Sequence, residues 1–187
     1  MEKESLELRR KWVFRSQGAR IHLIKKPGES SEHVFLKAFL WARYRKDYPG
    51  LEIEKSIGDR YKPDAIAFDP NDPDRAVFWA EAGQVKPGKV ISILRRFPGI
   101  HFVLAKWGFR KEPLVDLLRK DFSRDDRIIN NRPQVDLFQV NVQAHIHCIL
   151  NGEIRLVSSQ FSTLRIWPMD TASPEIVSRK KGKKEAM

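Results

Sequence analysis

The sequence predicts an α/β (α+β) fold built on a mixed β-sheet, and two observations carry this prediction. Between Glu29 and Trp107, helical and strand patterns follow one another in the order helix, three strands, helix, strand. The first three strands have short connections and should be antiparallel, whereas the third and fourth are joined through a helix and should be parallel. With 187 residues and 41% apolar residues, the chain fits one globular domain, which we expect to span 1–170.

The first core helix is predicted from its start signal and its apolar stripe. Pro27–Gly28 break the chain, and Ser30 or Ser31 can cap the helix that follows. Apolar residues then recur at helical spacing until Tyr48–Pro49–Gly50. Two short strands, WVFRS and ARIHLIKK, are expected ahead of this helix.

The remaining core elements are predicted as short apolar runs between turn residues. In chain order they are strands over 51–57, 64–69 and 75–82, a helix over 89–97 and a strand over 100–107. Beyond the core we expect a helix over 113–122. A C-terminal β meander should follow over 135–149, 153–157 and 162–167, with Asn151–Gly152 as a hairpin turn.

The chain is strongly basic, with a formal net charge of +11. Five basic residues and one acid lie within 179–185, so the rest of the chain keeps +7. We expect 171–187 to be a disordered basic tail. A basic excess on the folded part indicates a polyanionic partner such as DNA or RNA; solubility alone is the other explanation.

Cysteine content and hydropathy bear on where the protein works. The single cysteine, Cys148, excludes an internal disulfide framework. No apolar stretch reaches the roughly 18 residues of a membrane helix, and the N-terminal residues do not resemble a signal peptide. These features predict a cytoplasmic protein without a membrane partner.

Two acids are predicted to meet at one end of the sheet. Asp64 begins one strand, and Glu81 ends the next strand, its expected hairpin partner. Converging carboxylates favour a hard cation, and we expect Mg²⁺ or Mn²⁺ there. Glu32, in the first turn of the core helix, is a candidate third ligand. The alternative is a turn residue and a solvated strand end, but a charge directly after the apolar run 76–80 is costly unless it is paired.

Three segments of the chain resemble the YaeQ family. The segment 27–41 resembles the first YaeQ helix, with Pro27, Glu29, Glu32, Leu36 and Trp41 in register, and Phe78–Gly83 resembles a Trp-x-Glu-x-Gly strand end. Residues 135–167 resemble the closing strands of the family. The resemblance implies a variant of the PD-(D/E)XK nuclease fold with an αβββαβ core. It also implies that Glu32, Asp64 and Glu81 are the acids of the site.

The sequence departs from that pattern at the catalytic lysine. The lysine should follow Glu81 by two residues, where the chain has Gly83. Gln84 comes next, although strand alternation turns it to the other face. Candidate replacements are Lys86 and Lys89 from the following loop and helix, and Lys106 from the neighbouring strand. With Arg110, these lysines are also the candidate nucleic-acid contacts.

A second motif overlaps the same loop. Residues 83–89 match the first seven positions of the P-loop pattern GxxxxGK[ST]. Val90 stands where the Mg²⁺-binding hydroxyl should be, and Pro87 removes one backbone donor. These departures argue against nucleotide hydrolysis, although Gly88 and Lys89 at a helix start could hold a substrate phosphate.

Two further groups of residues have weaker functional readings. His145 and His147 would share one strand face beside Cys148, but no third and fourth zinc ligands stand at motif spacing. Trp107, Phe109 and Arg110 could stack on bases, although aromatic residues at a strand end more often belong to the core or its rim.

The sequence leaves two functions open. The first is a divalent-metal-dependent nuclease using Asp64, Glu81, Lys89, Lys106 and Gln84. The second is a catalytically decayed member of the same fold that binds nucleic acid or a protein without cutting it.

Overall fold

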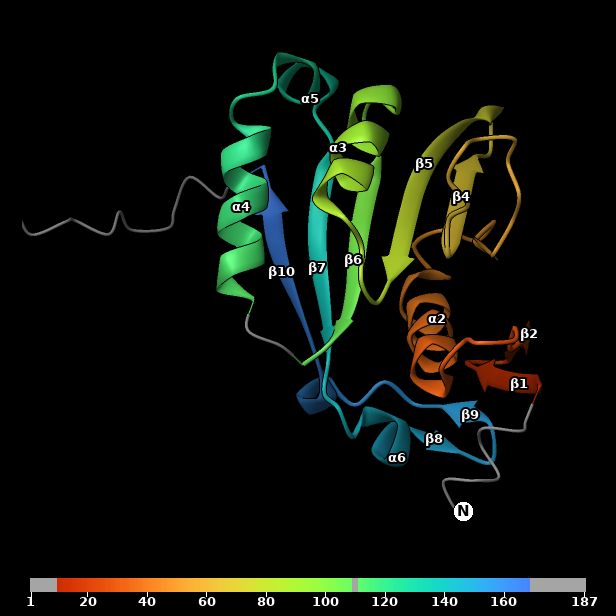
Figure 1. The fold of residues 1–187 in the computed structure, drawn as a ribbon. Coiled ribbons are helices and arrows are strands. Elements are labelled where there is room, and N and C mark those ends of the chain that lie inside the picture. Colours follow the sequence, from red (N-terminus) through yellow and green to blue (C-terminus); the bar gives the residue numbers. More distant parts are fainter. Residues whose placement is uncertain (1–9, 109–110, 169–187) are drawn as a thin grey trace, which may run out of the picture.

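A six-stranded mixed sheet forms the centre of the protein (Figure 1). The computed structural model describes residues 10–108 and 111–168. In spatial order the strands are β10 (Phe161–Trp167), β7 (Gln134–Val140), β6 (His101–Trp107), β5 (Asp72–Ala82), β4 (Ala65–Asp69) and β3 (Glu52–Ile53). Strands β3, β4 and β5 are mutually antiparallel, β5, β6 and β7 run parallel, and β10 returns antiparallel to β7.

Helices cover both faces of this sheet. They are α2 (Ser31–Tyr44), α3 (Pro87–Arg96), α4 (Glu112–Phe122) and the short α5 (Asp126–Asn131). The predicted order of helix, three strands, helix and strand is confirmed by α2, β3, β4, β5, α3 and β6. The predicted strand directions are confirmed as well.

Strand alternation sorts the buried side chains into two cores. Ala65 and Ala80 face α2, while Ile66 and Trp79 face the core that contains α3 and α4. Both faces of β5 are therefore apolar, as expected for a central strand that is covered on both sides. A charged side chain at the end of β5 is therefore shielded from water, where its charge is costly unless it is paired.

The predicted C-terminal meander is wrong in its middle. Only 134–140 form a strand, after which the chain turns into α6 (Ala144–Cys148). The next strands, β8 (Ile149–Leu150) and β9 (Glu153–Ile154), join β1 (Lys11–Ser16) and β2 (Ala19–Ile24) in a separate sheet of order β2-β1-β9-β8. A short 3₁₀ turn, η1 (Ser158–Gln160), leads back to β10. The segment 135–149 is longer than an ordinary strand, so its length already argued against one continuous strand, and periodicity alone did not show where the strand ends.

Two expectations about the whole chain meet the structure only in part. Within 10–108 and 111–168, no helix has the length and apolar character needed to cross a bilayer. The basic tail expected over 171–187 lies outside the described residues.

The turn between β8 and β9 gives a prediction for stability. Gly152 has φ of +80°, and a Cβ there would lie 2.7 Å from the Val13 carbonyl oxygen. Gly152→Ala should destabilise the fold by roughly 2 kcal/mol or more, because a left-handed alanine costs about 1–2 kcal/mol and the clash adds to it. Gly18 has the same φ with open space around it. Gly18→Ala should therefore lower the free energy of unfolding by less, as measured in urea. Equal decreases in the two variants would contradict the clash at Gly152.

Candidate functional site

Asp64 and Glu81 lie at the same end of the central sheet. Ala65 pairs with Ala80 across β4 and β5, and the Asp64 amide donates to the Ala80 carbonyl at 3.1 Å. The two acids flank this pair, one just before β4 and one near the end of β5. The hairpin therefore brings the positions of the two acids to one end of the sheet, as expected from their spacing.

Glu81 is a buried carboxylate with a partner on each oxygen. Only 5% of its side chain is exposed. Its Oε1 accepts a hydrogen bond from Trp79 Nε1 at 2.8 Å, and its Oε2 accepts one from Lys89 Nζ at 2.5 Å. Burial raises the pKa of Glu81, the charge of Asp64 raises it further, and the bonds from Lys89 and Trp79 offset this only in part. On balance, the surroundings of Glu81 thus oppose its ionisation.

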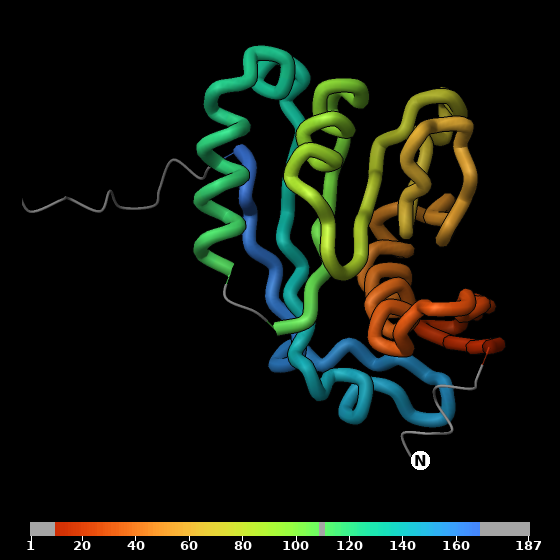
Figure 2. Tube along the Cα trace, viewed as in Figure 1, coloured from red at the N-terminus to blue at the C-terminus, as the bar shows by residue number. Residues whose placement is uncertain are grey.

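Lys89 reaches Glu81 because of the turn that follows β5. Gly83 has φ of +76°, a conformation that favours glycine, and its amide donates to the Ala105 carbonyl at 2.8 Å. The chain then reverses, and Pro87 begins α3 beside β5 (Figure 2). Lys89 therefore lies in the first turn of a helix that runs back along the strand, with its amine against the acid.

The other residues predicted around the missing lysine lie elsewhere in the site. Lys106 Nζ donates to the Gly83 carbonyl at 2.7 Å, and burial lowers the pKa of Lys106. Gln84 and Lys86 are exposed in the loop before α3. Since the amine of Lys89 is engaged by Glu81, the loop does not present this lysine outward as a P-loop would.

Asp64 is anchored from α2 and from β5. Its Oδ1 lies 3.3 Å from His33 Nε2, and its Oδ2 accepts a hydrogen bond from the Ala82 amide at 2.8 Å. Burial by itself would raise the pKa of Asp64, but the bonds from His33 and Ala82 outweigh it and hold the pKa below its ordinary value. Asp64 is therefore the more readily ionised of the two acids.

A charged network that the sequence analysis missed continues from Asp64 into α2. His33 Nε2 also lies 3.6 Å from Glu29 Oε1. Lys37, which has no exposed surface, donates to Glu29 and, at 3.0 Å, to Glu54. Part of the signal was present in the sequence, because His33 and Lys37 are four residues apart and share a face of α2, with Glu29 just ahead of the helix. That face meets Asp64 through His33 and Glu54 through Lys37.

Glu32 is not brought to the two acids by the structure. Its side chain is exposed at the start of α2, and its backbone carbonyl accepts a hydrogen bond from Trp107 Nε1 at 3.2 Å. Neighbouring helical residues diverge by about 100°, so the helix that directs His33 at Asp64 turns Glu32 away. In the described part of the chain, no group of three or more His, Cys, Asp or Glu side chains could hold a metal ion.

The remaining predicted sites do not join this one. His145 and His147 lie on the helix α6 rather than on a strand, so the expected shared strand face is wrong. His145 stacks on Phe35 with ring centroids 5.1 Å apart, whereas His147 is exposed. Trp107 packs against the core on the α2 side. Arg110 lies outside the described residues.

The donor chemistry of Asp64 and Glu81 fits a hard divalent cation. The two carboxylates lie at one end of the sheet, and the charge of Asp64 raises the pKa of Glu81. All four of their oxygens already have a protein partner. A cation between them would therefore have to replace some of these partners, in particular Lys89 on Glu81.

The backbone is similar to that of solved YaeQ structures. The YaeQ protein from Xanthomonas axonopodis pv. citri matches with a TM-score of 0.54 and 17% identity, over 82% of this chain and 93% of that chain. The YaeQ protein from Pseudomonas syringae matches with a TM-score of 0.51 and 14% identity, over 82% and 90%. No family model and no curated protein matches the sequence. At these identities the similarity concerns the fold, and the chain has the fold of the YaeQ proteins.

Proposed function

We propose that this protein is a divalent-metal-dependent phosphodiesterase that acts on nucleic acid. The observation that carries this proposal is the contact between Lys89 Nζ and Glu81 Oε2 at 2.5 Å, beside Asp64. Two acids and a lysine are the groups that the PD-(D/E)XK resemblance implies, and Lys89 supplies from α3 the amine that Gly83 lacks.

Each residue then has a defined role. Asp64 and Glu81 would hold Mg²⁺ or Mn²⁺, which would supply a polarised phosphate and an activated water. His33 and the Ala82 amide fix the orientation of Asp64, and Trp79 fixes that of Glu81. Lys89, which contacts Glu81, would be the amine that offsets negative charge developing on the phosphate.

The charge of the chain supports a nucleic-acid substrate. The net charge is +11, and most of it lies outside the C-terminal basic run. A basic protein gains affinity for nucleic acid by releasing counterions from the phosphates, so binding should weaken steeply with salt. Electrostatic attraction of this kind brings any phosphodiester backbone to the acids without sequence recognition.

A binding module without hydrolysis is the second candidate function. It is favoured by the four carboxylate oxygens that already have protein partners. A groove of about 1320 Å³ between β1, the start of α2 and α6 also supports it. Glu29 lines this groove and contacts His33, so a molecule bound there would be linked to Asp64 through these two side chains.

The substitution Asp64→Asn tests the proposed function. The wild-type protein should cleave DNA or RNA with Mg²⁺ or Mn²⁺ and lose this activity with EDTA. Asp64→Asn should reduce the rate by two orders of magnitude or more, because it removes a metal ligand. The metal should also raise the Tm of the wild type by linkage, and the variant should lose this gain.

The two candidate functions give different results in this experiment. Nucleic-acid binding without cleavage, and without a metal-dependent rise in Tm, would reject the enzyme and leave the binding module. Because hydrogen bonds stabilise ionised Asp64, Asp64→Asn should not stabilise the metal-free protein. The Tm of wild type and Asp64→Asn is also compared at the same EDTA concentration. A similar Tm there shows that the variant has not lost its fold.

A further inference from the structure

The segment 54–64, between β3 and β4, is fixed against α3. Arg96 Nη1 contacts Asp59 Oδ2, and Arg60 Nη2 donates to Ser92 Oγ. The Tyr61 amide donates to Asp59 Oδ1 at 2.8 Å, and the Tyr61 side chain packs against the core on this side of the sheet. A segment without regular secondary structure thus has a defined position next to the helix that carries Lys89.

Three cations surround the ring of Tyr61. Arg60 Cζ lies 4.5 Å from the ring centroid, Lys89 Nζ lies at 5.4 Å and Arg96 Cζ at 5.7 Å. The electron-rich face of an aromatic ring holds cations within about 6 Å without neutralising them. The ring therefore groups positive charge next to Glu81. Lys89 and Arg96 in this group are already paired with Glu81 and Asp59, whereas Arg60 contacts the Ser92 hydroxyl rather than a carboxylate.

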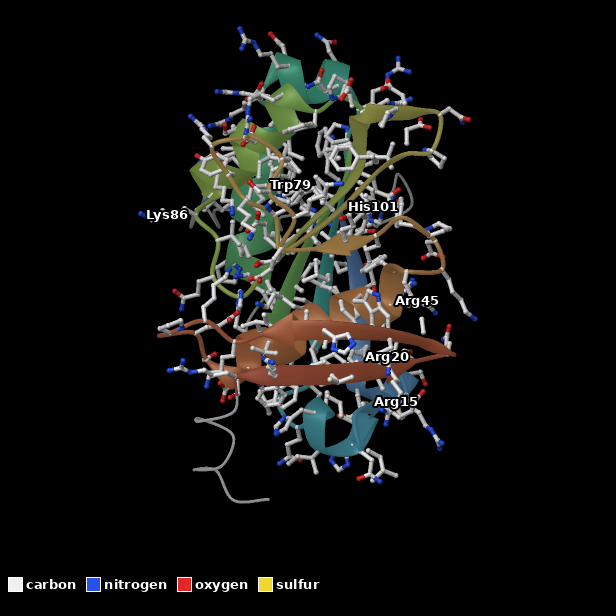
Figure 3. All side chains as sticks on the ribbon, turned by 90° about the vertical axis from the view of Figure 1, so that its right-hand side faces the viewer. Arg15, Arg20, Arg45, Trp79, Lys86 and His101 are labelled. Atoms are coloured by element: carbon white, nitrogen blue, oxygen red, sulfur yellow. The ribbon has the colours of Figure 1, made fainter. Side chains whose placement is uncertain are left out.

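Three cations on this side are exposed and form no direct ion pair in the described part of the chain. Within the described ranges, no carboxylate lies within ion-pair distance of Arg60, Lys62 or Lys86, and all three are exposed. Lys86 projects from one side of the molecule (Figure 3). Exposed cations that are held apart from carboxylates favour phosphate, and the planar guanidinium of arginine fits it well.

We propose that Arg60, Tyr61, Lys62, Lys86 and Arg96 form a surface, here called the Tyr61 surface, that binds the phosphate backbone of nucleic acid. Lys89 contacts both Tyr61 and Glu81, so a nucleic-acid strand bound to this surface would lie close to Glu81. The inference rests on the proposed function only for the cleavage of the bound nucleic acid. Binding to the surface does not require hydrolysis. Contacts to phosphate alone make this binding independent of base sequence.

The double variant Arg60→Ala/Lys62→Ala tests the Tyr61 surface. Fluorescence anisotropy in EDTA would use a labelled DNA of about 20 nucleotides, as a single strand and as a duplex. At low salt the dissociation constant should rise about tenfold or more. The slope of log K against log salt should become shallower by about two, since two phosphate contacts are lost. The two probes show which form of nucleic acid the surface prefers.

The control removes two cations from the other side of the molecule. Arg45 Cζ lies 5.4 Å from the Trp41 ring and Lys46 is exposed, and Figure 3 shows Arg45 on the side opposite to Lys86. Arg45→Ala/Lys46→Ala changes the net charge equally and should leave the affinity within about twofold. Tyr61→Phe, which keeps the ring, should bind like the wild type, whereas Tyr61→Leu should bind more weakly.

The outcomes separate this inference from the proposed function. Weaker binding by Arg60→Ala/Lys62→Ala in a protein that never cleaves would reject the enzyme and support the surface. Equal affinity loss in both double variants would indicate net charge alone and overturn the surface. Unchanged binding, absence of wild-type binding at low salt, or equal competition by polyglutamate would overturn it as well.

Discussion

Lys89→Ala is expected to reduce phosphodiester cleavage by about 10²–10³-fold, the usual effect of losing one preorganised donor to developing charge. Lys89 is the amine that contacts Glu81, whereas Lys106 contacts the Gly83 carbonyl. Lys106→Ala should therefore have the smaller effect. Initial rates at saturating Mg²⁺ on one DNA substrate provide the measurement.

The pH dependence of the same variant identifies Glu81 as the affected group. Lys89 lowers the pKa of Glu81 against the effect of burial, so its removal should raise that pKa further. Glu81 must be ionised to hold a cation, and the acid limb of the pH–rate profile should therefore move to higher pH. Lys46→Ala, an exposed lysine beyond the end of α2, should leave both rate and profile unchanged. A wild-type cleavage rate in Lys89→Ala would show that Lys89 does not take part in catalysis.

The core of the fold was predictable because its signals are local. The order of elements followed from apolar runs and turn residues, and the strand directions followed from connection lengths. The position of Asp64 opposite Glu81 then followed from the hairpin alone. The second sheet was not predictable in this way, because β1 meets β9 across more than a hundred residues and each strand of that contact is only a few residues long.

The charged side of the site was less predictable for a physical reason. Lys37 lies within an apolar helix, where a lysine is ordinarily assigned to a solvent-facing position. Its burial depends on Glu54, which precedes β4 in another part of the chain, and on Glu29 ahead of the helix. A spacing of four residues indicates a shared face, but only the tertiary structure tells whether that face meets water or two carboxylates.

The network around Lys37 links the stability of the fold to the geometry of the acids. Lys37 is fully buried and joins Glu29 to Glu54, and Lys26 donates to Glu54 at 2.7 Å. Burial alone would raise the pKa of Glu54, but the bonds from Lys26 and Lys37 outweigh it and lower the pKa. Through Glu29 and His33 the network reaches Asp64, so its loss should disturb both folding and the site.

Lys37→Met is expected to destabilise the protein by about 3–5 kcal/mol, because it leaves buried carboxylates without their cation. For a domain of this size the Tm should fall by roughly 10 °C. Adding Glu29→Gln should recover part of the loss, since it removes one uncompensated charge. The lowered pKa of Glu54 contributes stability that is present above its unfolded pKa and lost as the pH falls. The difference between wild type and variant should therefore narrow in acid, and urea unfolding at neutral and acidic pH measures it. A Lys37→Met protein as stable as the wild type at neutral pH would show that the network does not hold the site together.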